Sequence, residues 1–267
     1  REIARGEYGS AEGRITKVIE DPSSLWRGLT KAYERAGMTV KSEGEEYRRF
    51  IIPENYFVMS MLASMKGELK ESFEYAKAAV KEGLPFERLV AGPRAAFDNL
   101  YNTEYFQEWS KKECRALTHG PMLGNITADG ASFWVRTVHE TLIEIQVWPK
   151  GQSFIKNKKY AKSQTLAVKD FTTVIRIDSL RPNTNYEYKL FVDGKMMPVE
   201  NTSFKTYPEK GNPGKFSIAF GGGAGYVPEH ERVWTTVKDH NPLALLMLGD
   251  NVYIDNPEHS LTQQYCY

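Results

Sequence analysis

The spacing of apolar residues changes its period near residue 115, and this change restricts the chain to folds that join a helical part to a β-rich part. Up to about residue 112, apolar side chains recur every three or four positions, which is typical of helices packed in a layer. After that point short segments alternate between apolar and polar residues, which is the period of strands. We therefore expect a mixed fold, with a helical N-terminal region over residues 1–112.

Three helical segments are predicted in this region. The first covers residues 25–37, and the second begins near Pro53 and continues through residues 69–80. At least one more lies within residues 86–109, with a break near Gly92. The aromatic and methionine stripes of these segments indicate core packing more strongly than a groove for a ligand.

Four strands are expected between residues 113 and 208: residues 132–137, 142–147, 171–177 and 186–192. Short strands at this spacing predict a β-sandwich, and Asp193-Gly194 is a hairpin signal. Residues 180–186 (LRPNTNY) resemble the tyrosine corner of fibronectin III and immunoglobulin-like domains, where a tyrosine hydroxyl bonds to nearby backbone. Tyr186 and Trp134 are therefore interpreted as structural.

The C-terminal part, residues 209–267, begins with a linker-type segment and has the order strand, helix, strand. Residues 215–220 alternate as a strand, five small residues follow at 221–225, and Pro228 suits the first position of a helix. Residues 243–248 (LALLML) form a continuous apolar run, typical of a strand buried on both faces. This order predicts one right-handed βαβ unit of a parallel sheet.

Gly249 and Asp250 follow this apolar run directly, at the carboxyl end of the second predicted strand. Ligands of open α/β sheets bind beyond the carboxyl ends of strands, and a carboxylate there can hold one hard cation or bridge two. Tyr253 can add a phenolate ligand to a trivalent ion. On the local sequence, the alternative that Asp250 only forms a turn or a helix N-cap stays open.

The order of these motifs resembles the alkaline phosphatase D family of metallophosphatases. The resemblance covers residues 115–267 and rests on residues 117–121 (LTHGP), 129–130 (DG), 133–136 (FWVR) and 248–253 (LGDNVY). It implies a fibronectin III/Ig-like β-sandwich over residues 113–208. It also implies that residues 209–267 are the first βαβ unit of an α/β metallophosphatase domain that is truncated in this chain.

Metal-dependent hydrolysis of phosphate mono- or diesters by the intact protein is the activity that the resemblance implies, in the periplasm or outside the cell. This chain alone is expected to be inactive, and it contains no signal peptide. By the same resemblance Asp250 bridges the metal ions and Tyr253 binds the trivalent ion. Two or more ions are implied, iron and calcium in the family. Gly223 replaces the family's usual cysteine ligand, which leaves the identity of the metals open.

Four further residues near this edge are candidates for substrate binding. Gly222 and Gly223 can offer backbone N–H groups to a phosphate oxygen at a helix N-terminus, although close packing also explains small residues there. His230 follows the glycine-rich loop, and Asn251 adjoins Asp250.

Charge and hydropathy limit the partners. The 35 basic and 34 acidic residues give a net charge of +1, which offers no general attraction to nucleic acid, and no apolar run is long enough for a transmembrane helix. Cys114 and Cys266 allow either one disulfide or two thiols. The expected partners are a phosphate ester and the remainder of the chain's own catalytic domain.

A second hypothesis is a non-catalytic extracellular binding or scaffold protein with a degenerate phosphatase domain. Glycine at position 223, in place of a thiolate, favours this second hypothesis. In that case Asp250 is a turn residue, and the sandwich presents the surface for a partner.

Overall fold

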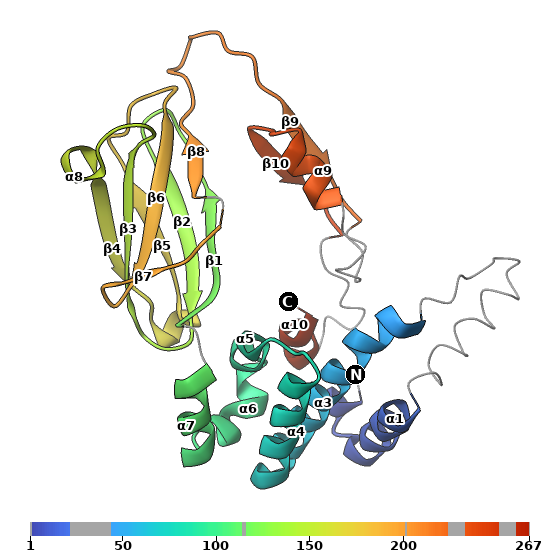
Figure 1. Cartoon of the computed structure of the whole chain (residues 1–267). Helices are drawn as coiled ribbons and strands as arrows, with labels where there is room; N and C mark the ends of the chain where they lie inside the picture. Colours follow the sequence, from blue (N-terminus) through green and yellow to red (C-terminus); the bar gives the residue numbers. More distant parts are fainter. Residues whose placement is uncertain are drawn as a thin grey trace, which may run out of the picture. The chain divides into compact units, whose positions relative to one another are not determined.

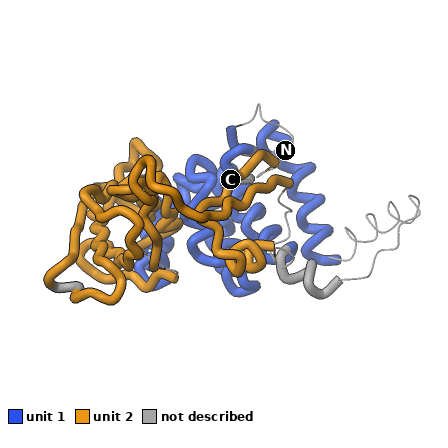
Figure 2. Tube along the Cα trace, turned by 90° about the horizontal axis from the view of Figure 1, so that it is seen from above, with its two compact units in different colours: residues 1–114, 253–267 blue, residues 115–252 orange. Residues whose placement is uncertain are grey.

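The computed structural model describes residues 2–21, 44–113, 116–200, 202–223, 233–250 and 260–266. The chain forms two compact units, residues 1–114 with 253–267, and residues 115–252 (Figure 2). The first unit is helical, and the second contains the strands (Figure 1). The mixed fold expected from the change in period is confirmed, and the predicted limits of the three domains stay predictions. No helix in the described stretches is long and apolar enough to cross a bilayer.

The helical unit is built around helices that pack through both aromatic and small side chains. Its elements are η1 (Ile3–Arg5), α1 (Tyr8–Glu20), α3 (Gly44–Lys66), α4 (Leu69–Lys81), α5 (Phe86–Ala91), α6 (Arg94–Tyr101), α7 (Glu104–Glu113) and α10 (Ser260–Cys266). The buried rings of Phe57 on α3 and Phe97 on α6 lie 5.3 Å apart between centroids. Ser60 on α3 and Ser72 on α4 each donate a 2.7 Å hydrogen bond to the other's carbonyl oxygen. The small serines let these two helices approach closely.

The expected helix start near Pro53 is wrong, because α3 begins at Gly44 and carries Pro53 in its interior. A proline removes one backbone donor from a helix and usually kinks or ends it. Here Ile52 and Pro53 are both buried, so packing offsets the lost hydrogen bond.

The expected continuation of that helix through residues 69–80 is also wrong, because a separate helix, α4, begins at Leu69. Gly67 has a φ of 84°, a left-handed conformation that commonly ends a helix. The predicted break near Gly92 is confirmed between α5 and α6. The predicted helix over residues 25–37 lies outside the described residues.

The second unit begins with two antiparallel sheets that share one apolar core. The strands are β1 (Leu117–Gly124), β2 (Ala131–Thr137), β3 (Leu142–Pro149), β4 (Lys159–Gln164), β5 (Thr172–Ile177), β6 (Asn185–Val192), β7 (Lys195–Met197) and β8 (Ser203–Lys205), with short helices α8 (Phe154–Asn157) and η2 (Ala167–Lys169) between them. One sheet has the order β1-β2-β5 and the other β4-β3-β6-β7, with β8 also paired to β6. Phe133, Ile145 and Leu190 are fully buried in the common core. This arrangement is a β-sandwich, and the four predicted strands are confirmed.

The tyrosine corner and the hairpin are confirmed as well. The Tyr186 hydroxyl accepts a 2.7 Å hydrogen bond from the backbone N–H of Arg181, and its ring stacks on Phe204 with 5.6 Å between centroids. Asp193 and Gly194 join β6 to β7 with φ values of 46° and 77°, as a type I′ hairpin turn requires. Local sequence therefore fixes both ends of β6.

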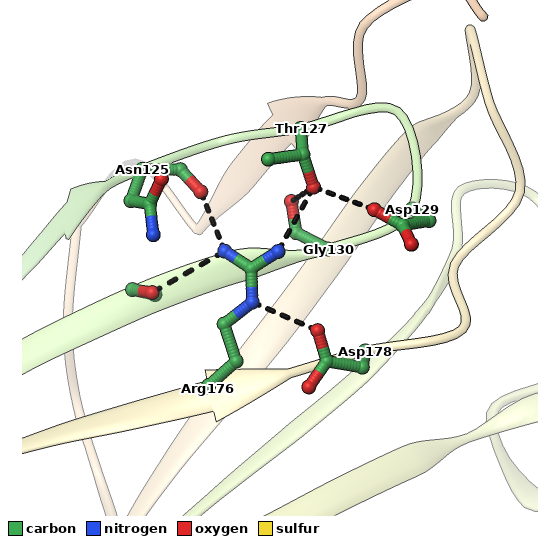
Figure 3. Close-up of polar contacts among 7 residues, drawn as sticks. Asn125, Thr127, Asp129, Gly130, Arg176 and Asp178 are labelled. Atoms are coloured by element: carbon green, nitrogen blue, oxygen red, sulfur yellow. Dashed lines mark hydrogen bonds and ion pairs between the residues drawn. The ribbon is translucent and has the colours of Figure 1, made fainter.

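Arg176 on β5 holds the connection between β1 and β2 in place (Figure 3). Its guanidinium donates to the Asn125 carbonyl oxygen at 2.7 Å, to the Thr127 hydroxyl at 2.9 Å and to the Asp178 carboxylate at 2.8 Å. A Cβ atom at Gly130 would lie 2.8 Å from the backbone carbonyl oxygen of Ile177 and would also displace the Arg176 guanidinium, so this position requires glycine. Gly130 belongs to the motifs that carry the family resemblance, and its role here is structural.

A βαβ unit follows the sandwich: β9 (Ile218–Gly221), α9 (Val233–Asp239) and β10 (Ala244–Met247). The two strands pair in parallel, with Ala244 opposite Ile218 and Met247 opposite Gly221. The predicted order and parallel pairing are confirmed, although β9 begins three residues later than expected. The predicted helix start at Pro228 lies outside the described residues.

The expectation that residues 243–248 form a strand buried on both faces is wrong in this chain. Leu245, Leu246 and Met247 are 38%, 51% and 41% exposed. Parallel sheets normally carry helices on both faces, whereas the described residues here supply two strands and α9. The described residues therefore do not bury the apolar side chains of this run.

We expect Tyr186→Phe to lower the free energy of unfolding by about 1–3 kcal/mol, because the partly buried Arg181 N–H loses its acceptor. Urea denaturation of the 267-residue chain measures this change. Tyr160→Phe is the matched control, because Tyr160 lies on the same sheet and is 61% exposed. The control should change stability by less than about 0.5 kcal/mol. Equal losses in the two variants would contradict the role of the corner.

Candidate functional site

The carboxyl ends of β9 and β10 meet at one edge, because the two strands are parallel. The Leu248 N–H donates a 2.8 Å hydrogen bond to the Gly221 carbonyl oxygen, so pairing continues past the end of β10. Two residues after Gly221 and one residue after Leu248, the Gly223 N–H donates a 3.4 Å hydrogen bond to the Gly249 carbonyl oxygen. The glycine-rich segment and the Gly-Asp pair are thus neighbours. We call residues 221–223 with residues 248–250 the β9–β10 edge.

Gly222 allows the closest approach at this edge. A Cβ atom there would lie 2.8 Å from the Gly249 carbonyl oxygen, a separation that side chains do not adopt. Gly223 and Gly249 have φ values of 73° and 122°, conformations that favour glycine. Close packing therefore accounts for Gly222, and backbone conformation accounts for the other two.

Asp250 leaves the sheet immediately after this contact. Its φ is 52°, in the left-handed region that aspartate tolerates better than most residues, and its side chain is exposed. Residues in sparsely populated backbone conformations occur at turns and gather at functional sites. The geometry therefore puts an accessible carboxylate where open α/β sheets bind ligands.

The donor atoms at the β9–β10 edge fit one class of metal ion better than another. The Asp250 carboxylate suits a hard cation such as calcium, which takes six to eight oxygen ligands, so other ligands are needed. Gly223 has no donor side chain, so iron bound by a thiolate at this position does not fit. In the part of the chain that the structure describes, no three histidine, cysteine or acidic side chains gather closely enough to hold an ion.

The structure brings together three of the six predicted site residues, Gly222, Gly223 and Asp250. Asn251, Tyr253 and His230 lie outside the described residues, as does Cys114, so their roles and the state of the cysteines stay predictions.

Gly249 was expected to let the backbone turn and other groups approach before Asp250, but its contact with residues 222–223 was not predicted. Its carbonyl oxygen faces both Gly222 and the Gly223 N–H. The sequence did carry one sign of this contact, because glycines follow the ends of both predicted strands.

A cavity of about 400 Å³ lies near the opposite ends of the two strands. It is lined by residues of the 207–214 linker and by Phe216, Ile218, Leu243 and Ala244. Ile218 and Ala244 begin β9 and β10, whereas ligands of open α/β sheets bind at the ends where such strands finish. The cavity is therefore separate from the β9–β10 edge.

A known family and solved structures are similar to parts of this chain. Residues 114–209 match a family described as "Domain of unknown function (DUF7800)". No curated protein is similar to the chain. Among solved structures, PhoD is similar with a TM-score of 0.43 and 17% identity, over 49% of this chain and 27% of PhoD. The chain thus corresponds to about a quarter of that protein.

Two further structures are similar over about a third of this chain. The sensor domain of the anti-sigma factor RsgI4 from Pseudobacteroides cellulosolvens has 24% identity and a TM-score of 0.27, over 38% of this chain and 94% of that domain. The third fibronectin III domain of human KIAA0343 has 16% identity and a TM-score of 0.25, over 35% of this chain and 82% of that domain. The sandwich assignment itself rests on the sheet order and the core described above.

We expect Gly222→Ala to separate the ends of β9 and β10, at a cost of about 1–3 kcal/mol, the range for overpacked sites. Hydrogen exchange of the Leu248 amide measures this, because that amide donates across the strand pair. Gly221→Ala is the matched control, since a Cβ atom there meets nothing within 4 Å. Equal acceleration in both variants, or an unprotected Leu248 amide in the unsubstituted chain, would contradict the packing described.

Proposed function

We propose that this chain contributes the first βαβ unit of a metallophosphatase domain, and that the intact protein hydrolyses phosphate mono- or diesters. The observation that supports this most is the position of Asp250. Its carboxylate lies at the carboxyl edge of a parallel strand pair, beside a glycine-rich segment. The order of motifs that resembles the alkaline phosphatase D family leads to the same activity.

Open space at the β9–β10 edge supports access for a bulky anion. Cβ atoms built at Gly221, Gly223 and Gly249 meet no heavy atom of the described residues within 4 Å. A phosphate group and its cation can therefore approach the backbone beside Asp250. Side chains at these three positions would fill that space.

The charge of Asp250 favours a metal-dependent reaction over a metal-free one. Two like unit charges 4 Å apart repel by about 1 kcal/mol in water and about 4 kcal/mol at an effective dielectric constant of 20. A phosphate ester beside this negative charge is thus disfavoured when no cation is bound, whereas a cation between the two is attracted to both. When bound, metal ions would neutralise the phosphate and supply hydroxide near neutral pH.

Asp250 serves this chemistry by holding and orienting the cation, and Tyr253 is proposed as a second ligand. One carboxylate supplies at most two of the oxygens that a hard cation takes, so further ligands must come from outside the β9–β10 edge. We propose that the site holds two or more metal ions, and calcium is compatible with the oxygen donor of Asp250. We also propose that the protein acts in the periplasm or outside the cell.

Asp250→Asn tests the proposal in the longest polypeptide that the gene encodes. We expect its metal content to fall and hydrolysis of p-nitrophenyl phosphate and bis(p-nitrophenyl) phosphate to drop by more than about a hundredfold. The reason is that loss of outer-shell partners alone costs about 10–100-fold. Metal analysis and steady-state kinetics measure the two effects. Asp239→Asn is the matched control, because Asp239 is exposed at the end of α9 in the same unit.

Unchanged hydrolysis in Asp250→Asn would contradict the role given to this carboxylate. A purified protein that binds no metal and hydrolyses neither ester would contradict the enzyme hypothesis as a whole. That second result would favour the non-catalytic binding or scaffold protein.

A further inference from the structure

One edge of the sandwich concentrates positive charge. Five lysines and no acidic residue occur within residues 150–164: Lys150, Lys156, Lys158, Lys159 and Lys162. All five are exposed. Since the whole chain has a net charge of only +1, this group, which we call the lysine patch, is a local excess.

The lysine patch follows the margin of the five-stranded sheet that contains β3, β4, β6, β7 and β8. β4 is the end strand of that sheet, and α8 and the turn before it connect β3 to β4 (Figure 1). Tyr160 lies among the lysines and is 61% exposed. A tyrosine has an apolar ring and a polar hydroxyl, and lysines have long apolar stems, so both suit a boundary between water and lipid.

Some of the five lysines also interact within the sandwich. Nζ of Lys162 lies 2.8 Å from Oε2 of Glu144 on β3, and this hydrogen bond raises the pKa of Lys162 and lowers the pKa of Glu144. The charge of Lys158 also contributes to lowering the pKa of Glu144. Lys159 donates a hydrogen bond to the Ser179 carbonyl oxygen. Lys150, Lys156 and Lys158 precede β4, so their substitution leaves the strand itself unchanged and they are the better positions for a test.

Protection of an exposed edge strand explains part of the lysine patch. Lysines on such strands discourage pairing with other chains, and this accounts for Lys159 and Lys162 in β4. Lys150, Lys156 and Lys158 lie in the turn and helix before the strand, where no strand edge needs protection. Their charge requires another explanation.

We infer that the lysine patch is a docking surface for an anionic lipid bilayer. Charge complementarity favours an anionic partner, since residues 150–164 carry five lysines and no acidic residue, and Glu144 on β3 pairs with one of these lysines, Lys162. The use of lysine favours a fluid lipid surface over an ordered phosphate site, because arginine supplies the rigid bidentate fork that such sites use. Each lysine near an anionic membrane surface strengthens binding by about fivefold.

Vesicle co-sedimentation of the 267-residue chain tests this inference. The vesicles are phosphatidylcholine alone or phosphatidylcholine mixed with phosphatidylserine, at low salt. The patch variant carries Lys150→Gln, Lys156→Gln and Lys158→Gln. Its matched control carries Lys70→Gln, Lys81→Gln and Lys112→Gln, three exposed lysines of the helical unit, so both variants lose the same charge.

We expect the chain to bind the phosphatidylserine vesicles and not phosphatidylcholine alone. The patch variant should lose affinity by on the order of a hundredfold, from three lysines at about fivefold each. The control variant should lose far less, and added salt should weaken binding of the unsubstituted chain. Equal thermal unfolding of the two variants shows that the exposed substitutions leave the fold intact.

Three results would overturn the inference. The first is no binding of the unsubstituted chain to phosphatidylserine vesicles. The second is an equal loss in both variants, which would mean that net charge alone governs binding. The third is binding to soluble polyglutamate far tighter than to phosphatidylserine vesicles at equal charge concentration, which would favour an acidic protein segment as the partner.

Discussion

The parallel pairing of β9 with β10 is the contact on which the candidate site depends. It brings residues 221–223 and 248–250 to one edge although a helix separates them in the sequence. The approach of Gly222 to the Gly249 carbonyl oxygen is close enough to exclude any side chain at position 222. Asp250 takes its left-handed conformation directly after this contact. Its location is therefore a consequence of backbone packing.

The same strand pair contains an energetic conflict. Burying a leucine or methionine side chain contributes about 1.5–3 kcal/mol, yet residues 245–247 keep a large part of their surface exposed. Two-stranded sheets are weak alone, because each strand has a free edge and an uncovered face. By contrast, the sandwich closes its own core with two complete sheets. We therefore expect the βαβ unit to be stable only when its exposed apolar residues are covered.

Sequence predicted the elements that carry a strong local signal. β2, β3, β5 and β6 alternate clearly, and the corner at Tyr186 has its own motif. β4 was not predicted, because its inward positions are Lys159, Ala161 and Ser163, which give no apolar alternation. β1 contains a glycine and a proline, and its pairing with β2 shifts register twice. In the helical unit, Pro53 was read as a helix start because burial around it was not visible in the sequence.

The position of the candidate site was predictable, and its internal packing was not. A carboxylate after an apolar run follows from strand order, so Asp250 was found. The contact between Gly222 and Gly249 joins segments that are distant in the sequence, and no local pattern reports a backbone distance of that kind. Gly222 was a candidate for substrate binding with close packing as the alternative, and the structure accounts for it by close approach.

The replacement of a thiolate by Gly223 bears on the choice of metal. Soft sulfur ligands select transition metals such as iron, whereas carboxylate oxygens suit calcium, magnesium or manganese. The described donor set of the β9–β10 edge is oxygen alone, so it favours a hard cation. A phosphoesterase built on this edge would then depend on the charge of its cations more than on a redox-active metal. Because hydrolysis needs charge neutralisation and an activated water, and no change in oxidation state, a hard cation can supply what the reaction requires.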